Sequence, residues 1–462
     1  MGRTNARARW RAAAAGLLAA GVVVGPVAAP AVAEDTIRQQ QWHLDAMHAP
    51  EMWKVSRGQG ITVAVIDSGF KLDHPDLEGQ FLPGKDFSGS AGGVGSFADG
   101  HGTGIASLIA GTGKGMGGTG AQGLAPGVKI LPLKINTGSV GALVSTDFLD
   151  QIGQAIAYAT GQGAKVVNIS QGVGAVTTFP ADVEKLNRII SAARAKGVLV
   201  VASVGNEAEK GNPVDYPGAL PGVVGVGASD RSGTVTAESE RGPQVDLVAP
   251  GMDMIAACIS STGYCKSRGT SDAAALVSAS AALVWSAHPD WTGNQILRVL
   301  INTAGKPASG DRTDTAGYGA VRPRIALTDP GDPGPADVSP LAADASVPSA
   351  ASSPSESASS SASASSAPSA PASPSDVAVG APTAQPKADA SSGSGGSVLP
   401  IVAAVVAGLA LVAGVVFVAL RRRSAARPEA HVSPVPAQQP ATPPSPPSYE
   451  PPVAPQDNPY AK

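Results

Sequence analysis

The chain has 462 residues, of which 43% are hydrophobic, 15% are charged and 4% are aromatic, and its formal net charge is −3. A charge this close to neutral gives no reason to expect a nucleic acid as partner. The 56 glycines and 40 prolines indicate one small-residue-rich globular domain joined to disordered segments. No Cys/His cluster has zinc spacing and no acidic loop has calcium spacing, so the sequence predicts no metal site and no cofactor.

Residues 1–33 have the features of a secretory signal. Arginines at positions 3, 7, 9 and 11 precede an apolar run over residues 12–24, and Ala31-Val32-Ala33 offers small residues where a signal peptidase recognises them. We expect cleavage after Ala33. An uncleaved anchor helix is the alternative, which the glycines and prolines between residues 16 and 30 disfavour.

Residues 34–327 are predicted to form the globular domain. Short runs rich in β-branched residues predict strands at 61–66, 129–135, 166–170, 198–203 and 223–226. Apolar residues spaced three and four apart predict helices at 146–160, 181–196, 272–288 and 294–304. Gly197 is a candidate C-cap and Thr292 a candidate N-cap. Near-continuous apolar strands alternating with helices predict an α/β fold, with a mostly parallel sheet covered by helices on both faces.

Two motifs place polar side chains after predicted strands, where ligands bind in folds of this type. Asp67-Ser68-Gly69 ends the first strand, and its carboxylate is either a buried catalytic group or a simple turn cap. Asn206 follows Gly205 after a later strand. The Asn206 amide is either a donor to a developing oxyanion or an ordinary turn former.

Two further motifs place a histidine and a serine at predicted helix starts. Of the six histidines, only His101 lies in the glycine-rich segment 99–104, where the backbone can turn tightly beside a cleft. Ser271 opens a small-residue helix, where backbone N–H groups and the helix dipole favour negative charge on a nucleophile. His101 can equally be a structural histidine, and a serine at a helix start is usually an N-cap.

The two cysteines, Cys258 and Cys265, flank Ser260-Ser261-Thr262-Gly263 and are predicted to form a disulfide that staples a hairpin before Ser271. Such a bond persists outside the cytoplasm. A catalytic cysteine is disfavoured, because neither has a histidine beside it in sequence.

The end of the chain predicts a membrane anchor. Residues 328–397 are rich in Ser, Ala and Pro and have too few large apolar groups to fold, which predicts a disordered stalk. Residues 398–420 carry no charge and would span about 34 Å as a helix, enough for a bilayer core of roughly 30 Å. Three arginines at 421–423 follow, which predicts a cytoplasmic C-terminus. The low-complexity flanks disfavour a buried core helix.

The last segment, residues 421–462, is rich in proline and is predicted to be a disordered cytoplasmic tail. A tail of this composition is either a polyproline ligand for a cytoplasmic partner or simply solvated chain. The sequence therefore predicts a single-pass membrane protein with its globular domain outside the cytoplasm.

The order Asp67, His101, Ser271 and the sequence around each residue resemble the subtilisin-like serine proteases, the subtilases, across residues 42–327. The matching segments are Val65-Ile66-Asp67-Ser68-Gly69, His74-Pro75-Asp76-Leu77, Gly100-His101-Gly102-Thr103, Gly123-Leu124-Ala125-Pro126-Gly127, Val167-Asn168-Ile169-Ser170, Gly205-Asn206 and Gly269-Thr270-Ser271. The resemblance implies the three-layer subtilisin-like fold and a serine endopeptidase activity.

The same resemblance implies a role for each candidate residue. Ser271 would attack the scissile carbonyl, His101 would pass its proton to the leaving amine, and Asp67 would orient the imidazole. Asn206 and the backbone N–H of Ser271 would bind the oxyanion. The residues implied to line the primary specificity pocket are Ser170, Gln171, Gly172, Ser203, Val204 and Gly205.

Two positions depart from the subtilase pattern. Asp272 stands where Met or Phe commonly follows the nucleophile, and Ala275 stands where proline is common. Asp272 could raise the pKa of His101, repel the oxyanion, or act only as a partner for the helix dipole. Without an oxidisable Met at this position, the enzyme is expected to resist peroxide better than subtilases that have one.

The layout of the whole chain is similar to that of the mycosins, the membrane-anchored subtilases of type VII secretion systems. The stretch from Glu34 to about Trp42 leaves no room for a folded inhibitory propeptide, which is compatible with this similarity. The similarity implies limited proteolysis of protein or peptide substrates at the outer face of the cell membrane, with a type VII secretion membrane complex as partner. The alternative is a scaffold or docking protein that uses a slow or inactive protease fold.

Overall fold

The computed structural model describes residues 36–137, 142–341 and 460. The predicted signal segment, the membrane span, and most of the stalk and tail lie outside these residues, so those assignments stay predictions. Among the helices of the described ranges, none combines the length and the apolar character needed to cross a membrane.

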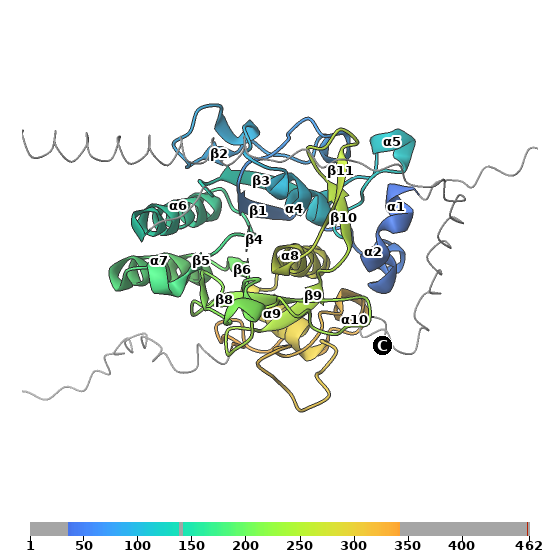
Figure 1. Ribbon diagram of the computed structural model, residues 1–462. Coiled ribbons are helices and arrows are strands. Elements are labelled where there is room, and N and C mark those ends of the chain that lie inside the picture. The colour runs from blue at the N-terminus through green and yellow to red at the C-terminus, as the bar shows by residue number, and fades with distance from the viewer. Residues whose placement is uncertain (1–35, 138–141, 342–459, 461–462) are drawn as a thin grey trace, which may run out of the picture. The chain divides into compact units, whose positions relative to one another are not determined.

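A seven-stranded parallel sheet runs through the centre of the domain in the order β2-β3-β1-β4-β6-β8-β9 (Figure 1). Its strands are β1 (Thr62–Asp67), β2 (Lys85–Asp86), β3 (Lys129–Lys134), β4 (Val166–Ile169), β6 (Leu199–Ser203), β8 (Val223–Ser229) and β9 (Leu247–Pro250). Every residue of β4, β6, β8 and β9 is buried. Burial on both faces explains why these strands are continuously apolar in sequence.

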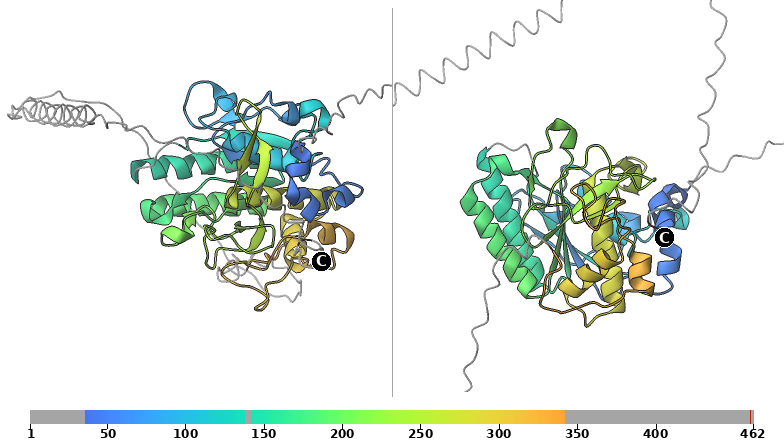
Figure 2. Two further views of the ribbon diagram at one scale, coloured as in Figure 1. Left: turned by 45° about the vertical axis from the view of Figure 1, so that its right-hand side comes forward. Right: turned by 90° about the horizontal axis from the view of Figure 1, so that it is seen from below.

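Helices cover both faces of the sheet and complete three layers (Figure 2). The helices on one face are α4 (His101–Ala110) and α8 (Thr270–Ala287), and those on the other are α6 (Ala142–Gly161) and α7 (Pro180–Ala195). Along β1, Val63 and Val65 belong to the core that contains α4 and α8, whereas Ala64 and Ile66 belong to the core with α6 and α7. Alternate strand residues therefore fill opposite cores, which confirms the predicted fold class.

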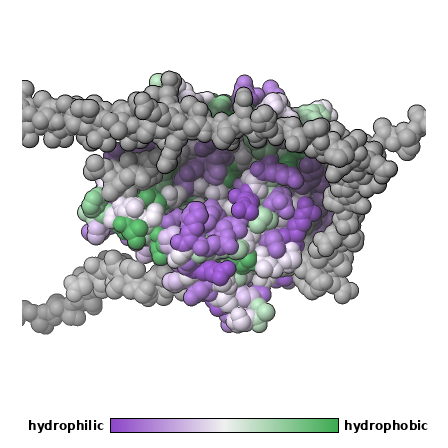
Figure 3. All heavy atoms as spheres, in the orientation of Figure 1, coloured by the Kyte–Doolittle hydropathy of each residue, from purple (hydrophilic) through white to green (hydrophobic). Residues whose placement is uncertain are grey.

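Smaller elements surround this framework. They are α1 (Ile37–Gln40), α2 (Trp42–Ala46), α3 (Ala49–Met52), α5 (Gly115–Gly118), α9 (Gly293–Asn302), α10 (Pro323–Thr328), and two antiparallel pairs, β5 (Val173–Gly174) with β7 (Asp215–Tyr216) and β10 (Met254–Ala257) with β11 (Tyr264–Ser267). The face of the molecule in Figure 3 carries mainly hydrophilic side chains across its middle.

The predicted element boundaries agree with the structure to within a few residues. Thr292 caps α9 through a capping box with Gln295, as predicted. Gly197 follows α7 with a φ of 81°, a left-handed conformation that glycine adopts without strain. The two edge strands were not predicted, because β2 is only two residues long and β9 ends in Pro250. The strand β9 lies at the edge of the sheet, where proline is tolerated.

The short segment before β1 packs onto the domain. Trp42 donates from Nε1 to the carbonyl oxygen of Met252 at 3.1 Å, and Gln41 donates from Nε2 to that of Gln122 at 2.9 Å. Next to them, His43 is completely buried, and neither of its ring nitrogens has a hydrogen-bond partner among the described residues. Burial, together with the charge of Arg38, lowers the pKa of His43 to about 3.

Candidate active site

Asp67 and His101 form a hydrogen-bonded pair at the carboxyl end of β1. Asp67 is the last residue of that strand and is fully buried. Its Oδ1 lies 2.8 Å from Nδ1 of His101, and its Oδ2 lies 3.0 Å from the same nitrogen. The backbone N–H of Ser68 and the amide of Gln171 also donate to Oδ1, at 2.8 and 3.1 Å. An ionised carboxylate only accepts, so Nδ1 of His101 carries the proton and Nε2 is left as an acceptor.

The glycine after His101 allows this pair to form. His101 is the first residue of α4, and Gly102 is buried where the helix meets β1. A Cβ at position 102 would lie 2.4 Å from the carbonyl oxygen of Gly69 and 3.0 Å from Cβ of Asp67. Any larger residue would push α4 away from Asp67, which explains the His-Gly pair in the sequence.

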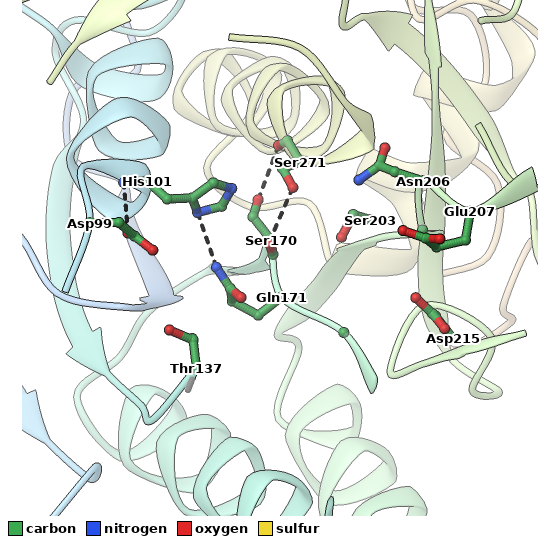
Figure 4. Close-up of a pocket in the computed structure, with 12 residues that line it drawn as sticks. Asp99, His101, Thr137, Ser170, Gln171, Ser203, Asn206, Glu207, Asp215 and Ser271 are labelled. Atoms are coloured by element: carbon green, nitrogen blue, oxygen red, sulfur yellow. Dashed lines mark hydrogen bonds between the residues drawn. The ribbon is translucent and has the colours of Figure 1, made fainter. Parts of the chain in front are cut away.

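Ser271 lies in the first turn of α8, across the cavity from α4. The imidazole of His101 is turned toward it (Figure 4). The Ser271 hydroxyl donates to the carbonyl oxygen of Ser170 at 3.2 Å, and the Ser170 hydroxyl donates to the carbonyl oxygen of Ser271 at 3.0 Å. In unliganded sites the bond between nucleophile and base is often long or absent and forms when substrate binds.

The amide of Asn206 is held beside Ser271 by its oxygen. Asn206 Oδ1 accepts from the backbone N–H of Thr270 at 2.8 Å and from the Thr270 hydroxyl at 3.1 Å. These bonds leave Nδ2 directed toward the cavity, where it lies near Ser271 (Figure 4). An amide fixed in this way can donate to an oxygen that becomes negative during the reaction.

Acidic side chains dominate the electrostatics around His101. Burial alone lowers the pKa of His101, but the charge and hydrogen bond of Asp67 and the charges of Asp272 and Asp99 outweigh it and raise that pKa to about 9. Asp272 is buried and accepts a 2.7 Å hydrogen bond from the Ser267 hydroxyl. Burial raises the pKa of Asp272 to about 6, against the lowering effects of that bond and of His101.

A cavity of about 340 Å³ opens beside these groups. The residues that line it are Asp99, His101, Thr137, Ser170, Gln171, Gly172, Ser203, Gly205, Asn206, Glu207, Asp215 and Ser271. Five of the six residues expected in the specificity pocket are among them, whereas Val204 is buried in the core. The sequence analysis did not identify Glu207 or Asp215. Glu207 follows Asn206 directly, but Asp215 reaches the cavity only because β7 pairs with β5.

The hairpin that leads to Ser271 is closed by the predicted disulfide. Cys258 and Cys265 are bonded across the β10–β11 turn, with their Cα atoms 5.7 Å apart. The backbone N–H of Cys258 also donates to the carbonyl oxygen of Gly263 at 2.7 Å. Across the described ranges, no three His, Cys, Asp or Glu side chains are grouped closely enough to hold a metal ion.

The buried carboxylate of Asp67 accepts from the His101 imidazole, and that imidazole is turned toward the Ser271 hydroxyl. These three kinds of group are the ones that a serine hydrolase triad contains. The family model described as Subtilase family matches residues 58–321. The chain therefore belongs to the subtilase family and is a subtilisin-like serine peptidase.

Known relatives agree with this assignment. Subtilisin Savinase of Lederbergia lenta is 31% identical over 290 residues, which cover 62% of this chain and 97% of that protein. The crystal structure of MycP1 from Mycobacterium smegmatis is 26% identical with a TM-score of 0.57, covering 66% of this chain and 89% of that one. A chain of the periplasmic assembly from the ESX-5 inner membrane complex is 28% identical with a TM-score of 0.56, covering 64% and 86%. The resemblance to subtilases and mycosins is confirmed.

Proposed function

We propose that this protein is a membrane-tethered, extracytoplasmic serine endopeptidase that performs limited proteolysis linked to type VII protein secretion. The observation that carries the catalytic part is the buried Asp67–His101 pair, whose imidazole faces Ser271 beside the fixed amide of Asn206. These are the kinds of groups that acyl transfer from a peptide uses, which supports the proposal.

In the proposed mechanism, Ser271 Oγ attacks the scissile carbonyl carbon while Nε2 of His101 takes its proton. The oxyanion that forms accepts hydrogen bonds from Asn206 Nδ2 and from the backbone N–H of Ser271. His101 then returns the proton to the leaving amine, and water releases the acyl group by the same steps in reverse order. Asp67 keeps the imidazole in the required tautomer and stabilises its positive form.

Sequence and relatives support the location. The uncharged segment 398–420 followed by three arginines is typical of a single spanning helix with a cytoplasmic C-terminus. The similarity to a chain of a periplasmic assembly in an inner membrane complex supports a protease domain outside the cytoplasm. A secretion complex at that membrane is the partner that this similarity favours.

One contact conflicts with this topology. Tyr460, the single described residue of the predicted tail, is buried with its hydroxyl hydrogen-bonded to Ser229 of the protease domain. A spanning helix would put these two residues on opposite sides of the membrane. An epitope tag after Lys462 distinguishes the cases: protection from protease added to intact cells supports the spanning helix, whereas digestion supports the contact.

The catalytic proposal is tested with a fluorophosphonate probe on the purified full-length chain beside Ser271→Ala. Labelling of the wild type that disappears in Ser271→Ala establishes an activated nucleophile. A folded wild type that takes no label contradicts the proposal. It would favour the docking protein, since the Ser271 hydroxyl bonds to Ser170 in the resting site.

A further inference from the structure

Three carboxylates gather at the end of the cavity away from His101. Glu207 and Asp215 line this end and lie opposite the histidine (Figure 4). Glu207 is partly exposed and pairs with Lys210 at 2.7 Å. Asp215 is half-buried, and its carboxylate makes no hydrogen bond or ion pair with any part of the chain that the structure describes. A negative group without a partner therefore faces the cavity.

Glu240 lies directly behind the cavity wall. Its side chain is completely buried, and its Oε1 accepts a 3.3 Å hydrogen bond from the backbone N–H of Glu207. Its Oε2 has no hydrogen-bond partner in the part of the chain that the structure describes. Gly205, which lines the cavity, has a φ of 116°, and a Cβ there would lie 2.3 Å from the Glu240 carboxyl. Glycine is thus required at 205 both by its backbone conformation and by the carboxyl that it covers.

The described residues that line this end of the cavity include no positive side chain. Burial, and then the charge of Glu207, raise the pKa of Asp215. Burial, and then the charges of Asp215 and Glu207, raise the pKa of Glu240 to about 8. Among the described residues that line the cavity, the only basic one is His101, at the other end. A positive group that entered beside Asp215 would relieve both desolvation and mutual repulsion.

We propose that this end of the cavity is a specificity pocket for a lysine or arginine side chain immediately N-terminal to the scissile bond, with Asp215 as its ionic partner. The inference rests on the proposed peptidase function and names its substrate class. Asp215 would accept directly from the guanidinium or ammonium group. The Ser170–Gly172 and Ser203–Gly205 segments would flank the aliphatic part of the side chain.

An apolar or acidic side chain fits this pocket poorly. An apolar group would remove water from Asp215 without replacing its hydrogen bonds, and an acidic group would add a further negative charge. A flexible side chain with a positive charge at its tip matches the negative charge of Asp215 in the pocket.

The test uses the full-length chain and internally quenched peptides that differ only in the residue before the scissile bond: Arg, Lys, Leu or Glu. Wild type is expected to cleave the Arg and Lys peptides with kcat/KM about 10²-fold above the Leu peptide. Asp215→Asn should lose most of that preference. Asp290→Asn, an exposed acid beyond the far end of α8, is the matched control and should behave like wild type.

A binding measurement separates this inference from the peptidase proposal. Benzamidine, a small aromatic cation, should bind the full-length Ser271→Ala chain in calorimetry and bind at least about tenfold more weakly when Asp215→Asn is added. Such binding with no fluorophosphonate labelling of wild type would support the cation pocket and contradict the peptidase. Equal cleavage of the Leu and Arg peptides by a labelled wild type, or no benzamidine binding, would overturn the inference.

Discussion

The carboxylates at the two ends of the active-site cavity differ in how many hydrogen-bond donors surround them. At one end, Asp67 accepts hydrogen bonds from His101, from Gln171 and from the backbone of Ser68. At the other end, Asp215 and Glu240 keep oxygens for which the described residues offer no donor. A carboxylate with several donors is held in place and orients the group that it contacts, whereas one without a donor can accept from a bound cation. We therefore propose catalysis at the first end and substrate selection at the second.

The largest expected effect comes from replacing Asp67, the carboxylate that accepts several hydrogen bonds. Asp67→Asn replaces an acceptor by an amide that can face Nδ1 of His101 with a donor, which favours the wrong tautomer. We expect kcat to fall about 10⁴-fold, a magnitude known from subtilisin and other triad enzymes. Peptide hydrolysis measured beside Asp290→Asn checks this, with circular dichroism as the control for folding. A variant that keeps a tenth of wild-type turnover would show that Asp67 is not the orienting group.

The next effect concerns the donor between the two ends. Asn206→Leu is similar in size and removes the amide that Thr270 holds toward the cavity. Because this amide would act only on the developing oxyanion, kcat should fall about 10²–10³-fold, as in subtilisin, with little change in KM. Steady-state kinetics separate the two constants. A rise in KM with unchanged kcat would instead place Asn206 in substrate binding.

The residues at the Asp67 end of the cavity could be predicted from the sequence, whereas those at the Asp215 end could not. Asp67, His101 and Ser271 each lie in a glycine-rich motif at a strand end or helix start, where local rules of backbone geometry apply. Asp215 arrives through the pairing of β5 with β7, and Glu240 through a loop that follows β8. Neither residue lies in a local sequence motif. Their proposed role depends on their burial and on the lack of hydrogen-bond donors beside them, and both of these follow from how the folded chain packs.

The fold shows the same division. Continuous apolar strands and helices with three-and-four spacing were located to within a few residues, because burial on both sheet faces is visible in the sequence. The hydrogen bond from Gln171 to Asp67 was not predicted, because it joins residues 104 positions apart in the chain. A side chain expected only in the specificity pocket thus also holds the catalytic carboxylate.

His43 extends the comparison to a group away from the cavity, because it too has no hydrogen-bond partner among the described residues. His43 has a pKa of about 3 in the folded chain, below its ordinary value of 6.5. The unfolded chain therefore gains a proton first as the pH falls, and stability decreases from about pH 6.5 down to about pH 3. The free energy of unfolding should fall by at most about 1.4 kcal/mol per pH unit, which amounts to about 2–3 kcal/mol between pH 6.5 and pH 4.5.

Urea unfolding of the wild type and of His43→Phe at these two pH values measures this loss. The variant should be less sensitive to pH over this range, since it has no imidazole to protonate in the unfolded chain. Equal losses in both proteins would mean that His43 is solvated or paired in solution.

The smallest expected effect comes from Asp272, because Asp67 already stabilises the positive form of His101 and Asp272 only adds to that stabilisation. His101 must be neutral to accept the Ser271 proton, and the carboxylates of Asp67, Asp272 and Asp99 hold its pKa at about 9. Activity should therefore rise with pH through that range. Asp272→Asn keeps the side-chain size but removes one charge, so the rising limb should move to lower pH by about one unit, with up to about tenfold more activity near pH 7.

The pH dependence of kcat/KM checks this shift, because it reports the free enzyme. Asp290→Asn should leave the limb in place. A limb that does not move in Asp272→Asn would mean that Asp272 is already neutral where His101 titrates, and that Asp67 and Asp99 set the basicity of the imidazole.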